Sequence, residues 1–443
     1  MKHLTSLLLA LLLPLIAYAQ FAGEWKGKLV MGQTELALVF KFVQHDSVVT
    51  GTLDVPQQGA KDLPIDKIYV SDNNISLSIS AIGFNYDGKL DESNSTIEGS
   101  MSQNGYSFPL VLKPNIKINR PQMPKSPFPY LQEEVVFYNS TDGNKLAGTL
   151  VKPLMMNANT PVAVLISGSG QQNRDEELME HKPFWVIADL LARIATLRYD
   201  DRGVGGSEAT GLATATTATF KGDALAAIDF LKNRGMKNIG VIGHSEGGLI
   251  AFMLGAEVEG LNFVISLAGT VVSGDQILIE QNRVLLKKSG MSADIVNSYC
   301  TLLNDIYSLK RSGAEFDRES KIAELKAKYT NLPLQMTGNI AALLQPQPWI
   351  DFFISYDPTE ALKKIGCRVL ALNGSNDVQV IASQNINALQ KHVASELLTT
   401  KIYPELNHLF QHSTTGMPNE YYQIEETISP EVLKDIVDWI KMK

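Results

Sequence analysis

The chain has 443 residues, of which 44% are hydrophobic and 19% are charged. A chain of this length is too long to fold around one small hydrophobic core, so two domains are expected. The 39 basic and 47 acidic residues give a formal net charge of -8 without a concentrated basic cluster, which argues against a nucleic-acid partner.

The first residues have the features of a secretory signal peptide. An apolar run over residues 7–16 is followed by Ala17-Tyr18-Ala19, an A-x-A cleavage site. The run is shorter than the roughly 20 residues of a membrane-spanning helix, and Pro14 interrupts it. We therefore expect cleavage after Ala19, a mature chain that begins at Gln20, and a periplasmic or secreted protein without a membrane span.

Residues 20–113 carry short alternating apolar and polar runs, such as 35–42 and 74–79, separated by Gly, Asp, Asn and Ser. About eight such runs fit in this stretch, and their even spacing predicts an antiparallel β domain, a small barrel or a sandwich.

Three aromatic residues of this β domain, Trp25, Tyr86 and Tyr106, could bind a substrate or a glycan if they were exposed. Single aromatic residues in strands more often belong to a core, and we favour that interpretation.

A proline-rich linker is predicted over residues 114–132. Proline disfavours both helix and central strand, and five prolines fall here. They are Pro114, Pro121, Pro124, Pro127 and Pro129.

Residues 133–443 follow a different pattern, in which continuous apolar runs alternate with helical periodicity. Such runs are typical of a buried parallel sheet, and the alternation predicts an α/β domain. The runs lie at 162–166, 194–197, 239–242, 263–267 and 368–372, and clear helical patterns lie at 216–232 and 430–441.

A glycine-rich turn, Ser167-Gly168-Ser169-Gly170-Gln171, follows the first of these runs. Backbone amides in such a turn can stabilise an oxyanion, and we assign Gly170 as the donor, with Ser169 or Gln171 as alternatives. A turn without a catalytic role is the other interpretation.

Two charged loops, residues 173–176 and 198–207, fall near the same edge of the predicted sheet. We interpret their charges as ion pairs that hold loops, not as reacting groups.

The segment Gly243-His244-Ser245-Glu246-Gly247 is a G-x-S-x-G sequence between a buried run and a helical pattern. This context is typical of a nucleophile on a strained strand-to-helix turn, where the flanking glycines remove clashing Cβ atoms. Ser245 is therefore the predicted nucleophile, and the amide of Glu246, at the start of the helix, is a predicted oxyanion donor.

Residues 274–364 interrupt the alternation with several helical patterns, which predict a cap inserted into the α/β domain. Trp349, Phe352 and Tyr356 could line a substrate pocket, but packing of the cap onto the body explains these rings equally well.

A serine nucleophile needs a base and an orienting acid, which are expected later in the chain in the order Asp, His. Asp377 follows the run at 368–372, and His408 follows another apolar run through Pro404 to Asn407. His412 is a nearby competitor for the base, and a turn-forming role is the alternative for Asp377.

No C-x-x-C or H-E-x-x-H sequence occurs, so a metal is not expected. Cys300 and Cys367 are the two cysteines, and whether they pair is left open.

Taken together, these motifs resemble the α/β-hydrolase superfamily over about residues 133–443. The loop at 200–207 and the GHSEGG turn resemble the bacterial esterase and serine-aminopeptidase-like branch. The resemblance implies a cofactor-free enzyme with Ser245, Asp377 and His408 as its triad, acting on acyl esters or short peptides. Ser167-Gly168 stands where the family commonly has His-Gly, and the β domain lies outside the resemblance.

The function favoured by the sequence is an exported, carboxylesterase-like serine hydrolase that acts on small or medium acyl esters. An exported peptidase or amidase is the alternative, and it would need an acidic anchor for a substrate amine, such as Glu280 or Asp351. A glycan-binding or partner-binding protein is a third alternative, but it has no need for nucleophile, base and acid together. The oligomeric state is left open.

Overall fold

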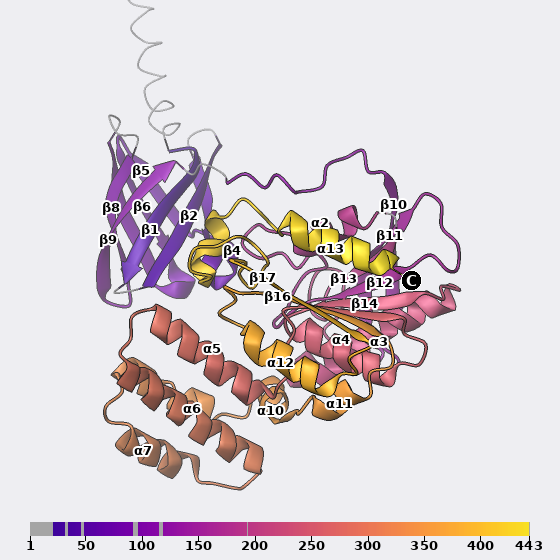
Figure 1. Cartoon of the computed structure of the whole chain (residues 1–443). Coiled ribbons are helices and arrows are strands. Elements are labelled where there is room, and N and C mark those ends of the chain that lie inside the picture. The colour runs from indigo at the N-terminus through magenta and orange to yellow at the C-terminus, as the bar shows by residue number, and fades with distance from the viewer. Residues whose placement is uncertain are drawn as a thin grey trace, which may run out of the picture. The chain divides into compact units, whose positions relative to one another are not determined.

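The computed structural model describes residues 21–31, 34–45, 48–91, 96–114, 118–192 and 194–442. The chain forms two compact units, residues 1–119 and 120–443 (Figure 1). The signal peptide and the cleavage site after Ala19 lie outside the described residues. Within the described ranges, no helix combines the length and the apolar character that crossing a membrane requires.

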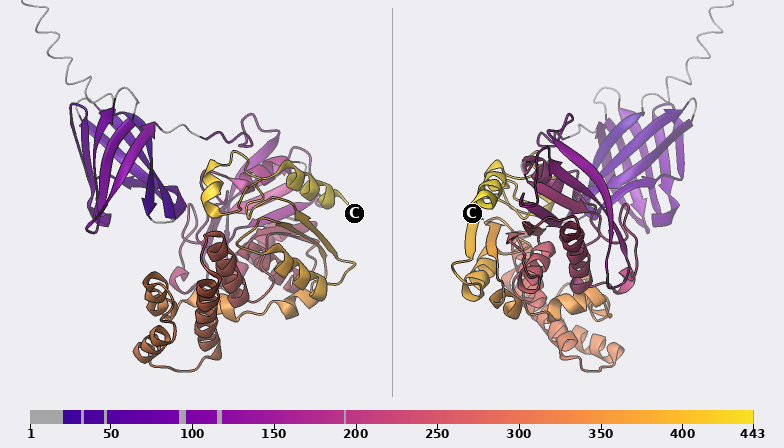
Figure 2. Two further views of the ribbon diagram at one scale, coloured as in Figure 1. Left: turned by 60° about the vertical axis from the view of Figure 1, so that its left-hand side comes forward. Right: turned by 90° about the vertical axis from the view of Figure 1, so that its right-hand side faces the viewer.

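The first unit contains one antiparallel sheet, which has nine strands in its described part, in the order β4-β3-β2-β1-β9-β8-β7-β6-β5. The amide of Ile65 donates to the carbonyl of Gly51 in β3, at 3.0 Å, just before β5 begins. The sheet therefore curls like a half-barrel (Figure 2). Of the two predicted architectures, a small barrel or a sandwich, this single curved sheet is closer to the barrel. The strands are β1 (Gly23–Met31), β2 (Thr34–His45), β3 (Val48–Val55), β4 (Ala60–Pro64), β5 (Lys67–Ser71), β6 (Asn74–Ile79), β7 (Phe84–Asp91), β8 (Thr96–Gln103) and β9 (Tyr106–Pro114).

The alternation of side chains along these strands produces a core on the inner face of the sheet. In β6 every second residue is buried, and Phe40 and Tyr86 stack inside with their ring centroids 5.9 Å apart. Trp25 and Tyr86 belong to this core, which confirms the structural interpretation of both, whereas Tyr106 is 70% exposed.

The second unit is built on an eight-stranded sheet in the order β10-β11-β13-β12-β14-β15-β16-β17. β11 runs antiparallel to both of its neighbours, β10 and β13. The remaining neighbouring strands pair parallel. β10 starts inside the range predicted for the linker. The strands are β10 (Tyr130–Tyr138), β11 (Lys145–Pro153), β12 (Val162–Ile166), β13 (Ala195–Tyr199), β14 (Ile239–His244), β15 (Phe263–Leu267), β16 (Arg368–Gly374) and β17 (Leu398–Tyr403).

Helices cover both faces of this sheet, which explains why its central strands are apolar throughout. α2 (Pro183–Leu190) and α13 (Pro430–Lys441) pack on one face. α3 (Thr217–Asn233), α4 (Glu246–Glu257) and α12 (Ala382–His392) pack on the other (Figure 1). The predicted α/β-hydrolase sheet is confirmed.

Between β15 and β16 the chain forms the cap, a run of helices over the predicted residues 274–364. Its buried side chains make a hydrophobic cluster of their own, around residues 302–307, 325–332 and 340–354. The helices are α5 (Gly274–Lys288), α6 (Ala293–Ser312), α7 (Arg318–Lys328), α8 (Leu334–Gly338), α9 (Ile340–Leu343), α10 (Pro348–Ser355) and α11 (Thr359–Lys363). Short 3-10 turns elsewhere are η1 (Pro56–Gln58), η2 (Ser80–Ile82), η3 (Leu212–Thr214) and η4 (Pro418–Gln423).

Candidate active site

Ser245 lies between the end of β14 and the start of α4, with φ 54° and ψ -117°. A residue with a Cβ atom is strained in this conformation, and such strain is common where a side chain must be presented for chemistry. The flanking glycines are needed because strand and helix approach closely. A Cβ at Gly243 would lie 1.9 Å from the carbonyl oxygen of Gly247, and one at Gly247 would lie 2.1 Å from that of Ile166.

His408 and Asp377 lie in the loops that follow β17 and β16. The Nδ1–H of His408 donates to Oδ2 of Asp377 at 2.8 Å, and both side chains are buried. Oδ1 of Asp377 accepts the amide hydrogens of Gln379 and Val380, at 2.8 and 2.9 Å. Because a carboxylate only accepts, this contact places the ring proton on Nδ1 and leaves Nε2 of His408 as a base.

Ser245 and His408 line the same cavity, whose volume is about 260 Å³. His412, the competing histidine, is not among the described lining residues. Its side chain is 61% exposed and pairs with Glu426 at 2.8 Å. The described lining residues are Gly168, Ser169, Gln172, Glu176, Leu178, His244, Ser245, Thr270, Ile277, Leu278, Gln281, Trp349, Phe353, Gln379, Val380, His408 and Leu409.

The glycine-rich turn after β12 forms one wall of this cavity. One amide of the turn is engaged, because Gly168 donates to Glu176 at 2.9 Å, and the amide of Gln172, the residue after the turn, donates to Asp201 at 2.9 Å. Four residues are predicted to supply oxyanion amides. Ser169 is a described lining residue of the cavity, while Gly170, Gln171 and Glu246 stand outside that set. Among the residues of the turn, this makes Ser169 the stronger candidate donor, and Gly170 stays a prediction.

The charged loops behind this turn are held by ion pairs, as predicted. Arg174 contacts Asp200 through Nε and Nη2, at 3.1 and 2.7 Å. Arg202 is fully buried and makes a two-pronged contact with Asp223, at 2.7 and 2.6 Å. Such planar contacts fix loop geometry more firmly than a single-point ion pair.

Asp201 ties the same region to the glycine-rich turn. Its carboxylate accepts the hydroxyl hydrogen of Ser167, at 2.8 Å, and the amide hydrogen of Gln172. Burial raises the pKa of Asp201 to about 7, and the two hydrogen bonds offset this only in part.

Of the three predicted aromatic residues, Trp349 and Phe352 lie in α10 and Tyr356 directly follows it. Trp349 lines the cavity and stacks on Phe353, with centroids 5.4 Å apart. Phe352 and Tyr356 stack on each other at 5.5 Å and are not among the described lining residues. All three pack with Phe353 in one hydrophobic cluster that includes Leu249 of α4, which supports the interpretation that these rings pack the cap onto the body.

Trp349 also connects the cap to the nucleophile turn. Its Nε1–H donates to Oε1 of Glu246 at 2.7 Å, and the hydroxyl of Thr217 donates to the same oxygen. Burial raises the pKa of the Glu246 carboxyl group. The side chain next to Ser245 is therefore an anchor for the cap, a role its sequence context did not suggest.

Sequence reasoning missed several residues of the cavity. Ile277, Leu278 and Gln281 of α5 were placed only within a helical cap, and Glu176 was grouped with the ion pairs of its loop. The amphipathic pattern of α5 could have indicated its inward face, but not which surface that face meets.

The two acidic residues considered as anchors for a substrate amine are engaged elsewhere. Glu280 pairs with Arg283 at 3.1 Å, and Asp351 pairs with Lys310 at 2.8 Å. Neither is among the described residues that line the cavity.

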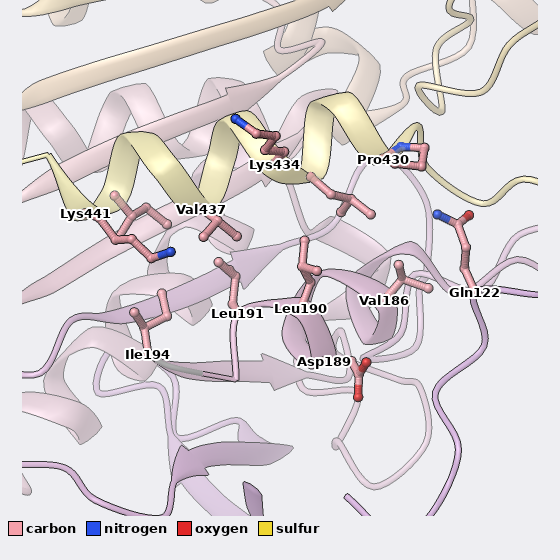
Figure 3. Close-up of a pocket in the computed structure, with 12 residues that line it drawn as sticks. Gln122, Val186, Asp189, Leu190, Leu191, Ile194, Pro430, Lys434, Val437 and Lys441 are labelled. Carbon is pink, nitrogen blue, oxygen red and sulfur yellow. The ribbon is translucent and has the colours of Figure 1, made fainter. Parts of the chain in front are cut away.

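A larger cavity, of about 490 Å³, lies between α2 and α13 and shares no described residue with the first. Figure 3 shows Val437 of α13 facing Leu190 and Leu191 across it. Its walls are mostly aliphatic, and Ser245 and His408 are not among them.

Within the described ranges, no group of three or more His, Cys, Asp or Glu side chains could hold a metal ion. Cys300 and Cys367 are both buried and unpaired, the first in α6 and the second just before β16.

Solved structures with similarity to this chain include an esterase from Pyrococcus furiosus, at 14% identity and a TM-score of 0.43, covering 74% of this chain and 98% of that one. A putative hydrolase from Agrobacterium vitis has 16% identity and a TM-score of 0.41, with coverage of 70% and 99%. Est1E from Butyrivibrio proteoclasticus, bound to ferulic acid, has 17% identity and a TM-score of 0.39, with coverage of 69% and 96%.

The comparison with curated proteins gave no match. The sequence model of the family described as serine aminopeptidase, S33, matches residues 187–414, just over half of the chain. This range contains Ser245, Asp377 and His408. The chain therefore belongs to the S33 serine aminopeptidase family of α/β hydrolases.

Proposed function

We propose that this hydrolase cleaves carboxylic esters through an acyl-enzyme on Ser245. The observation that carries the proposal is one cavity that holds both Ser245, on its strained turn, and His408, whose ring is fixed by Asp377 at 2.8 Å. Nucleophile, base and orienting acid on strand-end loops are the arrangement that acyl transfer requires.

In the proposed reaction, Ser245 Oγ attacks the ester carbonyl while Nε2 of His408 accepts the hydroxyl proton. The amides of Ser169 and Glu246 stabilise the oxyanion, and His408 returns the proton to the leaving alcohol. Water then attacks the acyl-enzyme with His408 again as base, which releases the acid and restores Ser245. Asp377 keeps the imidazole in its productive tautomer throughout.

The composition of the cavity supports an ester over a peptide with a free amino terminus. Among its described lining residues Glu176 is the one carboxylate, and it already pairs with His244 at 2.8 Å. A substrate ammonium would therefore meet, among the described lining residues, only a carboxylate that is already paired with a histidine. The volume of about 260 Å³ lies near the lower end of ligand sites, which supports a small or medium acyl group.

A peptidase is kept as the second candidate because the matching family is described as serine aminopeptidase. The two are separated by assaying the mature chain on p-nitrophenyl esters of increasing length beside aminoacyl and dipeptidyl anilides. Ester turnover that disappears in Ser245→Ala supports the esterase, and anilide turnover that disappears in the same variant supports the peptidase. Turnover that is unchanged in Ser245→Ala removes Ser245 from the mechanism.

We also propose that the protein is exported to the periplasm or beyond, on the signal-like sequence of residues 1–19 alone. Mass analysis of the amino terminus, after expression in a bacterium with a secretion pathway, tests this. A chain beginning at Gln20 is expected, and a chain that retains residues 1–19 in the cytoplasm contradicts export.

A further inference from the structure

His244, the residue before Ser245, uses both nitrogens of its ring in hydrogen bonds. Nδ1 lies 2.8 Å from Oε1 of Glu176, and Nε2 lies 3.0 Å from the backbone carbonyl oxygen of His408. A carbonyl oxygen and an ionised carboxylate oxygen only accept hydrogen bonds, so both ring nitrogens act as donors. Such a ring carries a positive charge.

The Glu176 carboxylate holds two parts of the site at once. Oε1, which binds His244, also accepts the amide hydrogen of Gly168 at 2.9 Å. Glu176 is 5% exposed and has a φ of 51°. Gly168 in turn lies close to the nucleophile, because a Cβ built on it would be 3.2 Å from Cβ of Ser245. One oxygen atom thus joins the glycine-rich turn to the nucleophile turn.

His244 extends this connection to the base. The ring centroids of His244 and His408 are 4.7 Å apart, and the bond to the His408 carbonyl fixes the backbone of that residue. His408 is then held at its ring by Asp377 and at its main chain by His244.

We propose that Glu176 and a positively charged His244 act as positioning residues, which together hold the base His408 and the oxyanion turn in register with Ser245. Neither needs to touch the reacting atoms. The inference rests on the proposed function, because it assigns a role relative to Ser245 and His408, and it adds a second histidine–carboxylate pair to the one formed by His408 and Asp377.

The charges around His244 agree with this role. The groups that face it are Glu176 from the loop after β12, Asp377 after β16 and His408 after β17. Burial alone would lower the pKa of His244, but the charge and hydrogen bond of Glu176 outweigh burial and raise it above its usual value. Asp201 is a further acidic neighbour of Glu176.

The test is the pH dependence of kcat/KM on a p-nitrophenyl ester in the full mature chain. The wild-type profile is expected to fall at alkaline pH, where His244 loses its proton and one of its two hydrogen bonds. In Glu176→Gln the ring loses its counter-charge, so this alkaline limb moves to lower pH by about one unit or more. At the wild-type optimum kcat falls by about 10- to 100-fold, because the base and the oxyanion turn are no longer aligned.

Two variants make the result specific. Glu176→Asp keeps the charge, so its alkaline limb stays near the wild-type position even if kcat falls. Glu426→Gln removes the carboxylate from the exposed pair with His412, which has the same 2.8 Å contact, and leaves rate and profile unchanged. A loss in Glu176→Gln that is equal at every pH overturns the proposal, and so does no loss at all.

If Glu176→Gln does not fold, a measurement on the wild-type chain tests the proposed positive charge of His244. Nitrogen NMR of the histidine rings at neutral pH is expected to show both nitrogens of His244 protonated, and a neutral ring overturns the proposal. Failure of the proposed function looks different, because Ser245→Ala then retains activity. If Ser245→Ala is inactive while Glu176→Gln behaves as the wild type, only this inference falls.

Discussion

Asp377 is held in place by three hydrogen bonds, since its carboxylate accepts from the ring of His408 and from two backbone amides. This fixes both the side chain and the ring it orients. In the proposed mechanism, Asp377 therefore sets the tautomer and the orientation of the His408 ring. A neutral side chain of the same shape cannot do this.

Replacement of Asp377 by Asn is therefore expected to lower kcat by about four orders of magnitude with little change in KM, because the amide favours the wrong tautomer of His408. Steady-state kinetics on a p-nitrophenyl ester measure the effect. His412→Gln, at the exposed competing histidine, is the matched control and should stay within about twofold of wild type. If kcat falls strongly in His412→Gln and is unchanged in Asp377→Asn, then His412 and not His408 is the base.

Asp201 gives a pH dependence of stability. Its folded pKa of about 7 is raised above the ordinary value of 3.8, so the folded chain binds this proton more tightly than the unfolded chain. The stability that the protonated group contributes is fully present below pH 3.8 and is lost as the pH rises to about 7.

In Asp201→Asn this titration is absent. The free energy of unfolding of the variant, relative to wild type, should rise by up to about 4 kcal/mol between acidic and neutral pH. Denaturant unfolding of both chains at about pH 4.5 and pH 8 measures the difference, and a lost hydrogen bond adds only an offset that is equal at both. The same difference at the two pH values contradicts the account.

At the residue scale, Ser245, Asp377 and His408 could be proposed from the sequence because each follows a recognisable strand, and the structure does place each of them after a strand. It could not separate Ser169 from Gly170, since which amide reaches the cavity depends on the path of the turn. The pairing of Glu176 with His244 joins residues 68 positions apart, and no local pattern connects them.

The turn between β14 and α4 is the element most sensitive to added volume. In Gly243→Ala the new methyl group would lie 1.9 Å from a backbone oxygen, which cannot rotate away. We expect a loss of at least about 3 kcal/mol in the free energy of unfolding, or failure to fold. Gly366→Ala is the control, because a Cβ there meets nothing within 4 Å, and thermal unfolding that is equally affected in both contradicts the argument.

The cap helix α10 sets part of the cavity through one of its faces. Trp349→Ala enlarges the cavity and should move the preferred acyl chain to a greater length, whereas Phe352→Ala should not, because Phe352 is not among the described lining residues. The measurement is kcat/KM across p-nitrophenyl esters from acetate to decanoate. An unchanged preference in Trp349→Ala means that this wall does not contact the acyl group.

The helical pattern of the cap was visible in the sequence, but the face that meets the cavity was not. An amphipathic period shows that one side is buried and does not tell a core from a substrate site. For this reason the ring of Phe353, which lines the cavity, was overlooked in favour of Phe352 and Tyr356.

At the scale of the whole molecule, each unit contains its own hydrophobic core. The core of the first unit draws on residues 21–112, and the large clusters around the second sheet draw on residues 135–440. All described residues that line the cavity at Ser245 belong to the second unit.

A fragment of residues 118–443 is accordingly expected to fold and to keep kcat/KM on a short ester within about threefold of the full mature chain, because its core and its cavity are complete without the first unit. Circular dichroism and the ester assay measure this. A fragment that is folded but inactive shows that the first unit contributes to the reaction.

The change from alternating strands to buried runs with helices was enough to predict the two kinds of architecture. Whether the first unit is a sandwich or one curled sheet could not be predicted, because alternation is the same in both and strand order is set by long-range pairing. The start of β10 at Tyr130 was also missed, since Pro127 and Pro129 precede it directly and were taken to extend the linker.

The central claim is that Ser245 is the nucleophile, and covalent labelling tests it most directly. The mature chain is treated with a fluorophosphonate, which reacts with activated serines, and the modified peptide is identified by mass. One adduct per chain, located on Ser245 and formed in parallel with loss of ester hydrolysis, is the predicted result. Complete inhibition with the label on another residue, or full activity after Ser245 is labelled, contradicts the account.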